Sequence, residues 1–479
     1  MSTQHPDNVS SPFFTDNSQI GGEDEIVEAY YAFSHLGCDE QMWDCEGKEI
    51  DNYVVKKLLT RYNNFFEKHR LGRDIFLTLR VPNPKVEKAE AKVLLETLES
   101  IPRSFDASNL IYDDEIAPIF EVILPMATSA RGCDRVYKYY RDFVAGKQNQ
   151  SFQEEGITIA DWIGKFNPEK VNVIPLVEDK KHMLNAHNIL KRYLSDKNPK
   201  YHRIFFARSD PAMNYGLISA VLINKIALQR IHRLSEDIGI EIYPIIGVGS
   251  APFRGNLRPD TVERVSNEYP SVHTFTIQSA FKYDNPPDEV KNAVKVLRER
   301  KRSPPRKVNE ERCLDIIDRY QEEYSKQIHS LAPLINKIAK FIPKRRKRKL
   351  HIGLFGYSRS MGEIKLPRAI TFTASLYSLG IPPEILGLNA LNDKDFEYIN
   401  EIYVNFEEDL KDALKYYNPD SDFLPEEIPR KIKRLGLDCK QNEEHIEITK
   451  RIQNSVKKIK AEDLSEQILR AANIRRFLG

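Results

Sequence analysis

Long hydrophobic runs are missing from this chain of 479 residues. The most apolar stretches, such as Ile242–Val248, are interrupted within about ten residues, whereas a membrane-spanning helix needs about 20. The opening residues, MSTQHPDNVSSPFFTDN, are polar and lack the apolar core of a signal peptide. We therefore expect a cytoplasmic protein with no membrane partner.

Cysteine is scarce and net charge is almost absent. The five cysteines lie far apart and form no C-x-x-C pair, which argues against a disulfide framework and a cysteine-ligated zinc site. The 72 Lys and Arg residues face 70 Asp and Glu residues, a formal net charge of +2. This balance excludes an acidic solvating polymer and a uniformly basic coat for nucleic acid.

What the sequence does contain is a repeated alternation of strand-like and helical patterns. Several strand-like runs are almost continuously apolar, as expected for parallel strands buried on both faces. Eight such units predict an α/β fold of the (β/α)8 barrel type. The first run is equally compatible with a helix. The predicted strands are Glu28–Leu36, Asp74–Val81, Ile119–Met126, Val171–Val177, His202–Arg208, Ile240–Val248, Ser271–Gln278 and Lys349–Tyr357.

Beyond residue 380 the pattern contains only helices. Because no Gly/Ser-rich linker precedes them, we expect a barrel domain over residues 1–380 and an all-α extension over 381–479 that packs on it. Two basic segments, RERKRSPPRK (Arg298–Lys307) and KRRKRK (Lys344–Lys349), are expected to be solvated surface loops.

Polar residues follow the predicted strands, at the end where barrels of this type carry their chemistry. Two carboxylate clusters and several arginines suit a divalent cation with a small, multiply charged anion. Mg²⁺ prefers one or two carboxylates plus substrate oxygens, and guanidinium groups match phosphate and carboxylate. These strand-end residues are Asp39, Glu40, Arg80, Glu178, Asp179, Arg208, Asp210, Gln278 and Arg359, with Arg254 in the glycine-rich GVGSAPFRG (Gly247–Gly255).

Taken singly, these residues also have simpler interpretations. Asp210 precedes a proline, an arrangement that favours a helix N-cap. Glu178 suits a solvated loop, and Arg80 and Arg359 suit surface ion pairs. A histidine as near the start of the chain as His5 is commonly frayed.

Together, the motifs resemble those of phosphoenolpyruvate carboxylase in its short form, which is typical of archaea and some bacteria. The resemblance extends from residue 2 to residue 479, and STQHPDN combined with SDPAMNYG and FGYSRSMG is more specific than any single motif. The matching segments are STQHPDN (Ser2–Asn8), TLRVPNP (Thr78–Pro84), VIPLVED (Val173–Asp179), FARSDPAMNYG (Phe206–Gly216), GVGSAPFRG, the stretch Gly356–Gly387 and the terminal AANIRRFLG.

The resemblance implies an enzyme that joins phosphoenolpyruvate and bicarbonate to give oxaloacetate and phosphate, through carboxyphosphate and a metal-bound pyruvate enolate. It also implies a homotetramer, as is typical of the family, and no nucleic-acid partner. We expect GVGSAPFRG to close over the site. The roles implied are catalysis for His5 and Arg254, substrate binding for Arg80, Arg359, Arg208 and Gln278, and binding of Mg²⁺ or Mn²⁺ for Glu178 and Asp210.

The chain also departs from the large form of the family. Val248 stands where that form has a second arginine in the glycine-rich loop, and Met213 replaces the lysine after the metal-binding aspartate. We expect Arg208, Arg131 or Arg368 to compensate.

Three other functions account for parts of the sequence. The first is another Mg²⁺-dependent barrel enzyme that handles an enolate, either a phosphotransferase or a carbon–carbon lyase. Such an enzyme would use the same carboxylates and arginines, but this function does not explain the STQHPDN motif. A nucleic-acid-binding protein is opposed by the charge balance. A helical scaffold leaves the carboxylate–arginine rim unexplained.

Overall fold

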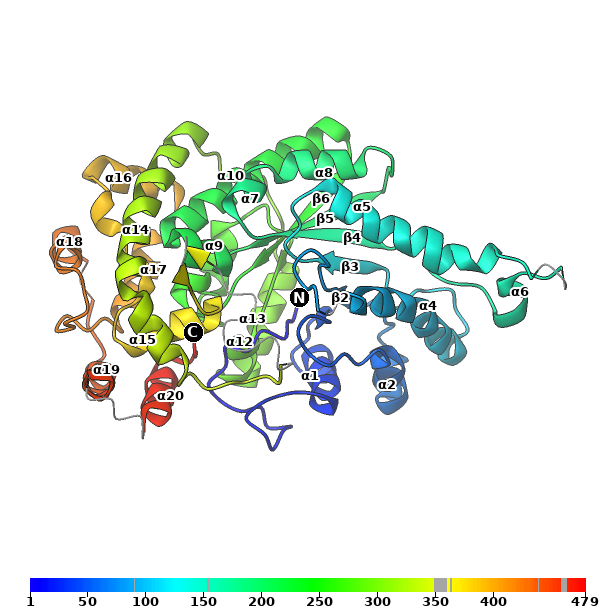
Figure 1. Ribbon diagram of the computed structural model, residues 1–479, viewed down its shortest axis with the longest axis horizontal. Coiled ribbons are helices and arrows are strands. Elements are labelled where there is room, and N and C mark those ends of the chain that lie inside the picture. The colour runs from blue at the N-terminus through cyan, green and yellow to red at the C-terminus, as the bar shows by residue number, and fades with distance from the viewer. Residues whose placement is uncertain (90, 153–155, 349–359, 362–363, 438, 458–462) are drawn as a thin grey trace.

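The computed structural model describes residues 1–479 except 90, 153–155, 349–359, 362–363, 438 and 458–462. At its centre seven parallel strands follow one another in chain order and curl into a barrel (Figure 1). A separate antiparallel pair, β8 and β9, lies outside the barrel. The strands are β1 Glu40–Asp44, β2 Phe76–Arg80, β3 Glu121–Leu124, β4 Asn172–Val177, β5 Tyr201–Ala207, β6 Glu241–Gly247, β7 Thr274–Phe275, β8 Ser360–Met361 and β9 Ile364–Lys365.

The first residues of the chain join the two edge strands of this sheet. Ser2 forms parallel bridges to Gln41 of β1 on one side and to Ile277, just after β7, on the other. Its N–H donates to the carbonyl of Glu40 at 2.7 Å. This segment therefore occupies the gap between β7 and β1 in the barrel wall. The predicted eighth strand, Lys349–Tyr357, lies outside the described residues.

Strands β2–β7 confirm six of the predicted strands, whereas the first prediction is wrong. Glu28–Leu36 lies mostly in helix α1 (Glu23–Ser34). The true first strand, β1, has only five residues with a polar residue at each end, so no hydrophobic run marks it. Asp39 and Glu40 consequently lie at the amino end of a strand, at the opposite end of the barrel from the predicted rim. The buried apolar residues of α1 recur at helical spacing: Ile26, Ala29, Ala32 and Phe33.

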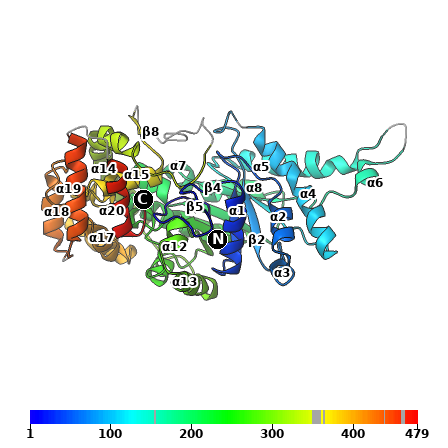
Figure 2. The same cartoon turned by 90° about the horizontal axis from the view of Figure 1, so that it is seen from below.

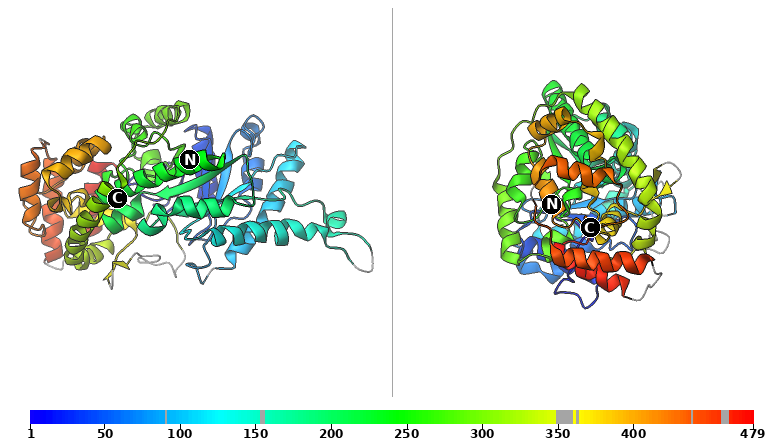
Figure 3. Two further views of the ribbon diagram at one scale, coloured as in Figure 1. Left: turned by 90° about the horizontal axis from the view of Figure 1, so that it is seen from above. Right: turned by 90° about the vertical axis from the view of Figure 1, so that its left-hand side faces the viewer.

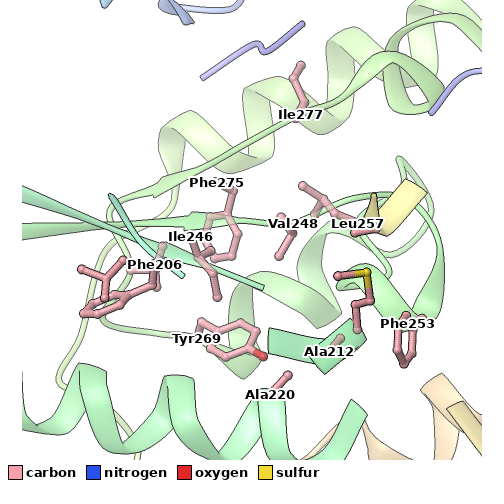
Figure 4. Close-up of a cluster of buried hydrophobic side chains, with 14 of the residues drawn as sticks. Phe206, Ala212, Ala220, Ile246, Val248, Phe253, Leu257, Tyr269, Phe275 and Ile277 are labelled. Carbon is pink, nitrogen blue, oxygen red and sulfur yellow. The ribbon is translucent and has the colours of Figure 1, made fainter. Parts of the chain in front are cut away.

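Helices cover the outside of the barrel. Figure 4 shows part of the core between them and the sheet, where Phe206 of β5, Ile246 of β6 and Phe275 of β7 gather near Ala220 of α10. Among the described residues, no helix has both the length and the apolar composition to cross a bilayer. The helices are α2 Val54–Arg61, α3 Asn63–Phe66, α4 Val93–Tyr112, α5 Ala130–Lys138, α6 Ile159–Ile163, α7 Lys180–Leu184, α8 Ala186–Leu194, α9 Ser209–Tyr215, α10 Leu217–Ile238, α11 Val262–Glu268, α12 Ser279–Tyr283, α13 Pro287–Glu299, α14 Glu310–Ala339 and α15 Ala369–Ser378.

Beyond Gly380 the regular structure that is described is helical, as predicted. Figures 1 and 2 place α18 and α19 at one end of the molecule and α6 at the other, and Figure 3 agrees. The buried apolar core runs without a break from the barrel into these helices, and the division at residue 380 stays a prediction. The helices are α16 Asp393–Ile402, α17 Phe406–Leu414, α18 Glu427–Leu435, α19 Glu443–Lys457 and α20 Leu464–Arg475.

The basic segment Lys344–Lys349 contains buried arginines, contrary to the prediction of a solvated loop. Arg345 and Arg346 are only 6% and 3% exposed. Arg346 donates to the carboxylates of Glu25 and Glu28 in α1, each at 2.8 Å. The prediction failed because these acidic partners precede Arg346 by 321 and 318 positions, beyond the reach of any local pattern.

Candidate active site

A cavity of about 320 Å³ opens at the carboxyl ends of the strands, and we call it the carboxyl-end cavity. Its lining comes from several strand ends, from the N-terminal segment and from the chain after α14, so the barrel topology assembles it. Arg359 lies outside the described residues. All the other predicted site residues line the cavity: His5, Arg80, Glu178, Arg208, Asp210, Arg254 and Gln278.

Glu178 and Asp210 follow neighbouring parallel strands, β4 and β5, and both are half-buried at the cavity wall. Asp210 is the second residue of α9, whose N-cap is Arg208, so the N-cap alternative is wrong. Two hard oxygen donors at adjacent strand ends fit Mg²⁺ or Mn²⁺, which bind one or two carboxylates and leave positions for water and substrate oxygens. No cluster of three or more His, Cys, Asp or Glu side chains suited to a metal ion occurs among the described residues.

His5 lies on an N-terminal segment that is packed rather than frayed, since residues 1–4 are buried. Its Nδ1 is 2.9 Å from Oγ1 of Thr3. Burial holds the pKa of His5 well below its usual value, and the positive charge of Arg80 lowers it further. His5 is therefore neutral at pH 7, which is the form of imidazole that accepts a proton.

Asp7 fixes the segment two residues after His5. One of its carboxylate oxygens accepts the N–H of Ala280 at 2.7 Å, and the other lies 3.2 Å from Nη1 of Arg254. Its carbonyl accepts the N–H of Leu478 at 2.7 Å, so the two ends of the chain meet beside the cavity.

A second acidic residue, Asp284 at the end of α12, holds the same segment further along. Its two oxygens accept the N–H groups of Val9 and Ser10, each at 2.7 Å. Arg345 donates to the carbonyls of Asn8 and Val9 from the predicted loop Lys344–Lys349. Burial raises the pKa of Asp284 to about 7, and the bonds from the two N–H groups oppose this rise. The position of His5 therefore depends on side chains that are distant in sequence.

Replacing Asp284 with alanine should loosen this attachment. Because two backbone N–H groups lose their acceptor, we expect a stability loss of about 1–3 kcal/mol and slower turnover in the reaction that the sequence resemblance implies. Thermal melting and steady-state kinetics test this. Asp288→Ala, which removes an exposed carboxylate at the start of α13, is the matched control. Unchanged melting and kinetics in the Asp284 variant would contradict the expectation.

Arg254 is 2% exposed and has protein partners on all three nitrogens. Its Nε donates to Oγ of Ser209 at 3.1 Å, Nη1 faces Asp7 and the carbonyl of Gly479, and Nη2 donates to Gln278. Burial lowers the pKa of Arg254, while Asp7 and Asp210 oppose the shift. Arg254 thus connects the His5 segment, the C-terminus and the end of β7.

The glycine-rich loop around Arg254 is a buried part of the cavity floor. Residues 248–257 are all buried, and Figure 4 shows Val248 and Phe253 within the apolar cluster. The loop is therefore packed in the interior in this conformation, and its closing movement stays a prediction. A Cβ on Gly249 would lie 2.8 Å from Cζ of Arg254, so the glycine makes room for the guanidinium group.

Gly249→Ala should displace this guanidinium group. Because four hydrogen-bond partners hold it in place, we expect a stability loss of about 1–3 kcal/mol and at least a tenfold fall in turnover of the reaction that the sequence resemblance implies. Thermal melting and steady-state kinetics measure the two effects. The control is Gly132→Ala, where the new Cβ meets its nearest atom at an ordinary 3.7 Å. Wild-type kinetics in the Gly249 variant would show that the position of Arg254 is unimportant.

Arg80 forms a buried, two-pronged ion pair with Asp44, the last residue of β1. Its Nε lies 3.1 Å from Oδ1 of Asp44, and Nη2 faces Oδ2. Burial alone would lower the pKa of Arg80, but Asp44 and Glu46 raise it above its usual value. At 7% exposed, Arg80 is not part of a surface ion pair, so that alternative is wrong.

Sequence reasoning missed several residues that line the cavity, above all Glu46 and three arginines. Arg348 is half-buried and donates to the carbonyl of Glu46 at 3.0 Å. Burial lowers the pKa of Arg348 to about 10, against the opposing effect of Asp44, so it stays charged. The run KRRKRK just before FGYSRSMG was the available signal. The missed arginines are Arg345, Arg346 and Arg348.

The residues expected to compensate for the missing family arginines differ in position. Arg368, just before α15, and Arg208 both line the cavity. Arg208 donates to the carbonyl of Phe253 at 3.1 Å, which ties it to the glycine-rich loop. Arg131 is exposed in α5 and is not among the lining residues, so it fills none of these gaps.

A family model and two of the relatives named here match the whole chain. A family model described as phosphoenolpyruvate carboxylase matches residues 1–479. Relatives named phosphoenolpyruvate carboxylase include those of Methanospirillum hungatei (59% identical; 100% of this chain and 99% of the relative covered) and Methanothermobacter thermautotrophicus (56%; 100% and 99%). That of Pyrococcus furiosus is 55% identical over 91% of this chain and 95% of its own length. A solved HpcH/HpaI aldolase from Desulfitobacterium hafniense covers 63% of this chain and 93% of its own, at 13% identity and a TM-score of 0.33.

Proposed function

The chain belongs to the phosphoenolpyruvate carboxylase family, and from this premise we propose that the carboxyl-end cavity is its active site. The protein is an enzyme that joins phosphoenolpyruvate and bicarbonate into oxaloacetate and phosphate. One observation carries the assignment of the site: three carboxylates, several arginines and a neutral histidine line a single cavity at the carboxyl ends of the strands. Two anionic substrates and a proton transfer require this combination.

In this proposal Glu178 and Asp210 hold a divalent cation, Mg²⁺ or Mn²⁺. When bound, the ion supplies Lewis-acid stabilisation of negative charge on the enol oxygen. The contribution of the chain is to fix the two carboxylates. Asp210 is set by the first turn of α9, and Glu178 follows directly on β4, which pairs with β5.

Arginines neutralise the phosphoryl group as it passes from phosphoenolpyruvate to bicarbonate. Arg80, Arg348 and Arg368 line the cavity and are our candidates for this role. Substrate binding stays a prediction for Arg208, Gln278 and Arg359. The contacts of Arg254 support a positioning role beside the catalytic one predicted for it, because its nitrogens are already bonded within the protein.

His5 takes the proton from the carboxyl group of carboxyphosphate. The electrons of the O–H bond form the second C=O of CO₂ as the bond between carbon and the phosphate oxygen breaks. The released electron pair stays on phosphate, which can later accept the proton from His5. Apolar side chains of Met126, Leu176 and Phe205 line the same cavity and suit the retention of neutral CO₂.

A coupled assay tests the proposal by following oxaloacetate while one component at a time is omitted. We expect formation to require phosphoenolpyruvate, bicarbonate and Mg²⁺ together. Release of phosphate that does not depend on bicarbonate in the unmodified enzyme would instead favour another enolate-handling reaction.

We further propose that the enzyme is a cytoplasmic homotetramer. The oligomeric state follows from the family resemblance, and the location is supported by the five cysteines, all of which are free thiols. Sedimentation equilibrium of the purified chain measures the oligomeric state. The location is tested by fractionating the source cells and applying the oxaloacetate assay to each fraction.

A further inference from the structure

A second cavity, of about 440 Å³, lies at the amino ends of the strands, and we call it the amino-end cavity. Its volume is within the range of about 300–1,000 Å³ that is usual for small-molecule sites. It shares no lining residue with the carboxyl-end cavity. The carboxylation proposed above uses none of its side chains.

Three buried charged residues from different strands meet in this cavity. Arg203 of β5 donates from Nη1 to Glu40 of β1 and Glu121 of β3, each at 2.8 Å, and from Nη2 to the second oxygen of Glu40, also at 2.8 Å. Burial alone would lower the pKa of Arg203, but the two carboxylates raise it above its usual value. Arg203 offsets one of the two negative charges and holds both carboxylates by hydrogen bonds, so they oppose an incoming anion less than free carboxylates would.

Three more arginines come from the basic segment Arg298–Lys307, which is exposed at most positions. Arg298 lies in the last turn of α13, and the chain becomes extended at Arg300, the C-cap of this helix. Arg298, Arg300 and Arg302 all line the cavity, whereas Lys301 between them is exposed and does not. The segment therefore presents alternate basic residues to the amino-end cavity.

Arg300 lacks the acidic partner that its two neighbours have. Arg298 pairs with Asp39 at 3.3 Å and Arg302 pairs with Glu241, but no ion pair to Arg300 occurs among the described residues. Its Nε is buried and without a hydrogen-bond partner, while Nη2 donates to the carbonyl of Val272. Burial and the charge of Arg302 lower the pKa of Arg300 to about 10, so it is charged at pH 7. A half-buried guanidinium group with an unused N–H calls for an anion.

The side-chain charges around the cavity balance, so its attraction for an anion is local to Arg300. Four lining arginines face three lining carboxylates and Glu241, the partner of Arg302 outside the lining. His273 adds no charge, because burial lowers its pKa to about 4, with a further contribution from Arg203. The residues counted are Arg203, Arg298, Arg300 and Arg302 against Asp39, Glu40, Glu121 and Glu241.

Aromatic side chains form much of the remaining wall. The rings of Tyr243 and His273 meet edge to face with centroids 4.8 Å apart, and Arg300 lies over the ring of Phe275 at 4.9 Å. Aromatic walls of this kind accept a flat organic ring through stacking or edge contacts. The aromatic residues are Phe76, Phe120, Tyr201, Tyr243, His273 and Phe275.

We propose that the amino-end cavity binds a small organic anion with a planar aromatic body and a phosphate group. The phosphate pairs with the guanidinium group of Arg300, and the ring lies among the aromatic side chains. A mononucleotide has this chemistry. The site is separate from the carboxylation site and requires no turnover.

Isothermal titration calorimetry of the full chain with AMP tests this proposal. Adenosine, which lacks the phosphate, and inorganic phosphate, which lacks the ring, serve as the two comparison ligands. We expect AMP to bind with one site per chain and each comparison ligand to bind at least tenfold more weakly. Arg300→Met should weaken AMP binding about tenfold to a hundredfold, the usual effect of losing a charged hydrogen bond.

Lys301→Met is the matched control, since it removes the adjacent cation outside the cavity. It should bind AMP as the unmodified chain does. Wild-type carboxylation kinetics in both variants would show that each one folds, and Arg300→Lys provides a second variant that keeps the charge and should bind with intermediate affinity. No binding of AMP at millimolar concentration, or equal binding by the Arg300→Met variant, would overturn the proposal.

Discussion

Replacing His5 with asparagine should abolish oxaloacetate formation while leaving a slow, metal-dependent hydrolysis of phosphoenolpyruvate to pyruvate. Asparagine keeps the size and polarity of the side chain but cannot accept the proton of carboxyphosphate. Positioned proton transfer contributes about 10²–10⁴-fold, so we expect oxaloacetate to fall by at least that factor. Phosphate and pyruvate should be measured together with oxaloacetate, because the prediction concerns how the products divide.

A loss of folding would mimic part of this result, so a control is needed. His35→Asn changes an exposed histidine on the outside of the barrel and should leave carboxylation unchanged. The thermal melting of both variants should match that of the unmodified chain. Full carboxylation by the His5 variant would remove this residue from the mechanism.

The protonation of His5 also predicts the pH dependence of the reaction. Because burial and the charge of Arg80 hold its pKa well below 6.5, the proton-accepting form predominates throughout the neutral range. Carboxylation should therefore persist below pH 6.5 and fall only as the pH passes through that lowered pKa. Replacing Arg80 with methionine removes one cause of the shift and should move this acid limb towards higher pH in the activity that remains.

The barrel itself was predictable because of how its strands are buried. Strands β2–β7 have helices outside and a packed interior, so they are apolar on both faces and stand out in the sequence. β1 does not stand out in the sequence, because it has only five residues and a polar residue at each end, Glu40 and Asp44. The bridging of Ser2 between β1 and the end of β7 could not be predicted either, since it joins residues 275 positions apart through backbone bonds alone.

In the candidate site, too, the predictable residues are those with a signal in the local sequence, and the others depend on tertiary contacts. Glu178 and Asp210 were found because they follow apolar strands, and His5 was found through its motif. Arg345 and Arg346 were misjudged as solvated because a run of charges usually is. Their partners are the carbonyls of the His5 segment and the carboxylates of α1, which only the folded chain brings near. Long-range ion pairs therefore decide which basic residues become part of the site.

Asp210→Ala should eliminate the dependence of the reaction on Mg²⁺ and lower carboxylation by at least about a thousandfold, with little effect on folding. A metal held by two protein carboxylates loses half of its charged ligands in this variant. We expect a modest structural cost because Asp210 lies in the first turn of α9 without capping it, where the loss of its helix-dipole interaction costs about 0.3–1 kcal/mol. Mg²⁺ titrations of activity and thermal melting measure the two effects separately.

Asp179→Ala is the control that shows the effect of losing a helix cap instead of a metal ligand. Asp179 neighbours Glu178 but does not line the carboxyl-end cavity, and its side chain caps α7 by accepting the N–H of His182 at 3.0 Å. Its removal should cost about 1 kcal/mol of stability and leave the Mg²⁺ dependence intact. If Asp210→Ala behaves in the same way, losing stability while keeping its affinity for Mg²⁺, then Asp210 is a structural residue and the metal is held elsewhere. If Asp210 is a metal ligand and Asp179 is a helix cap, Asp210→Ala should lose activity and Asp179→Ala should lose stability.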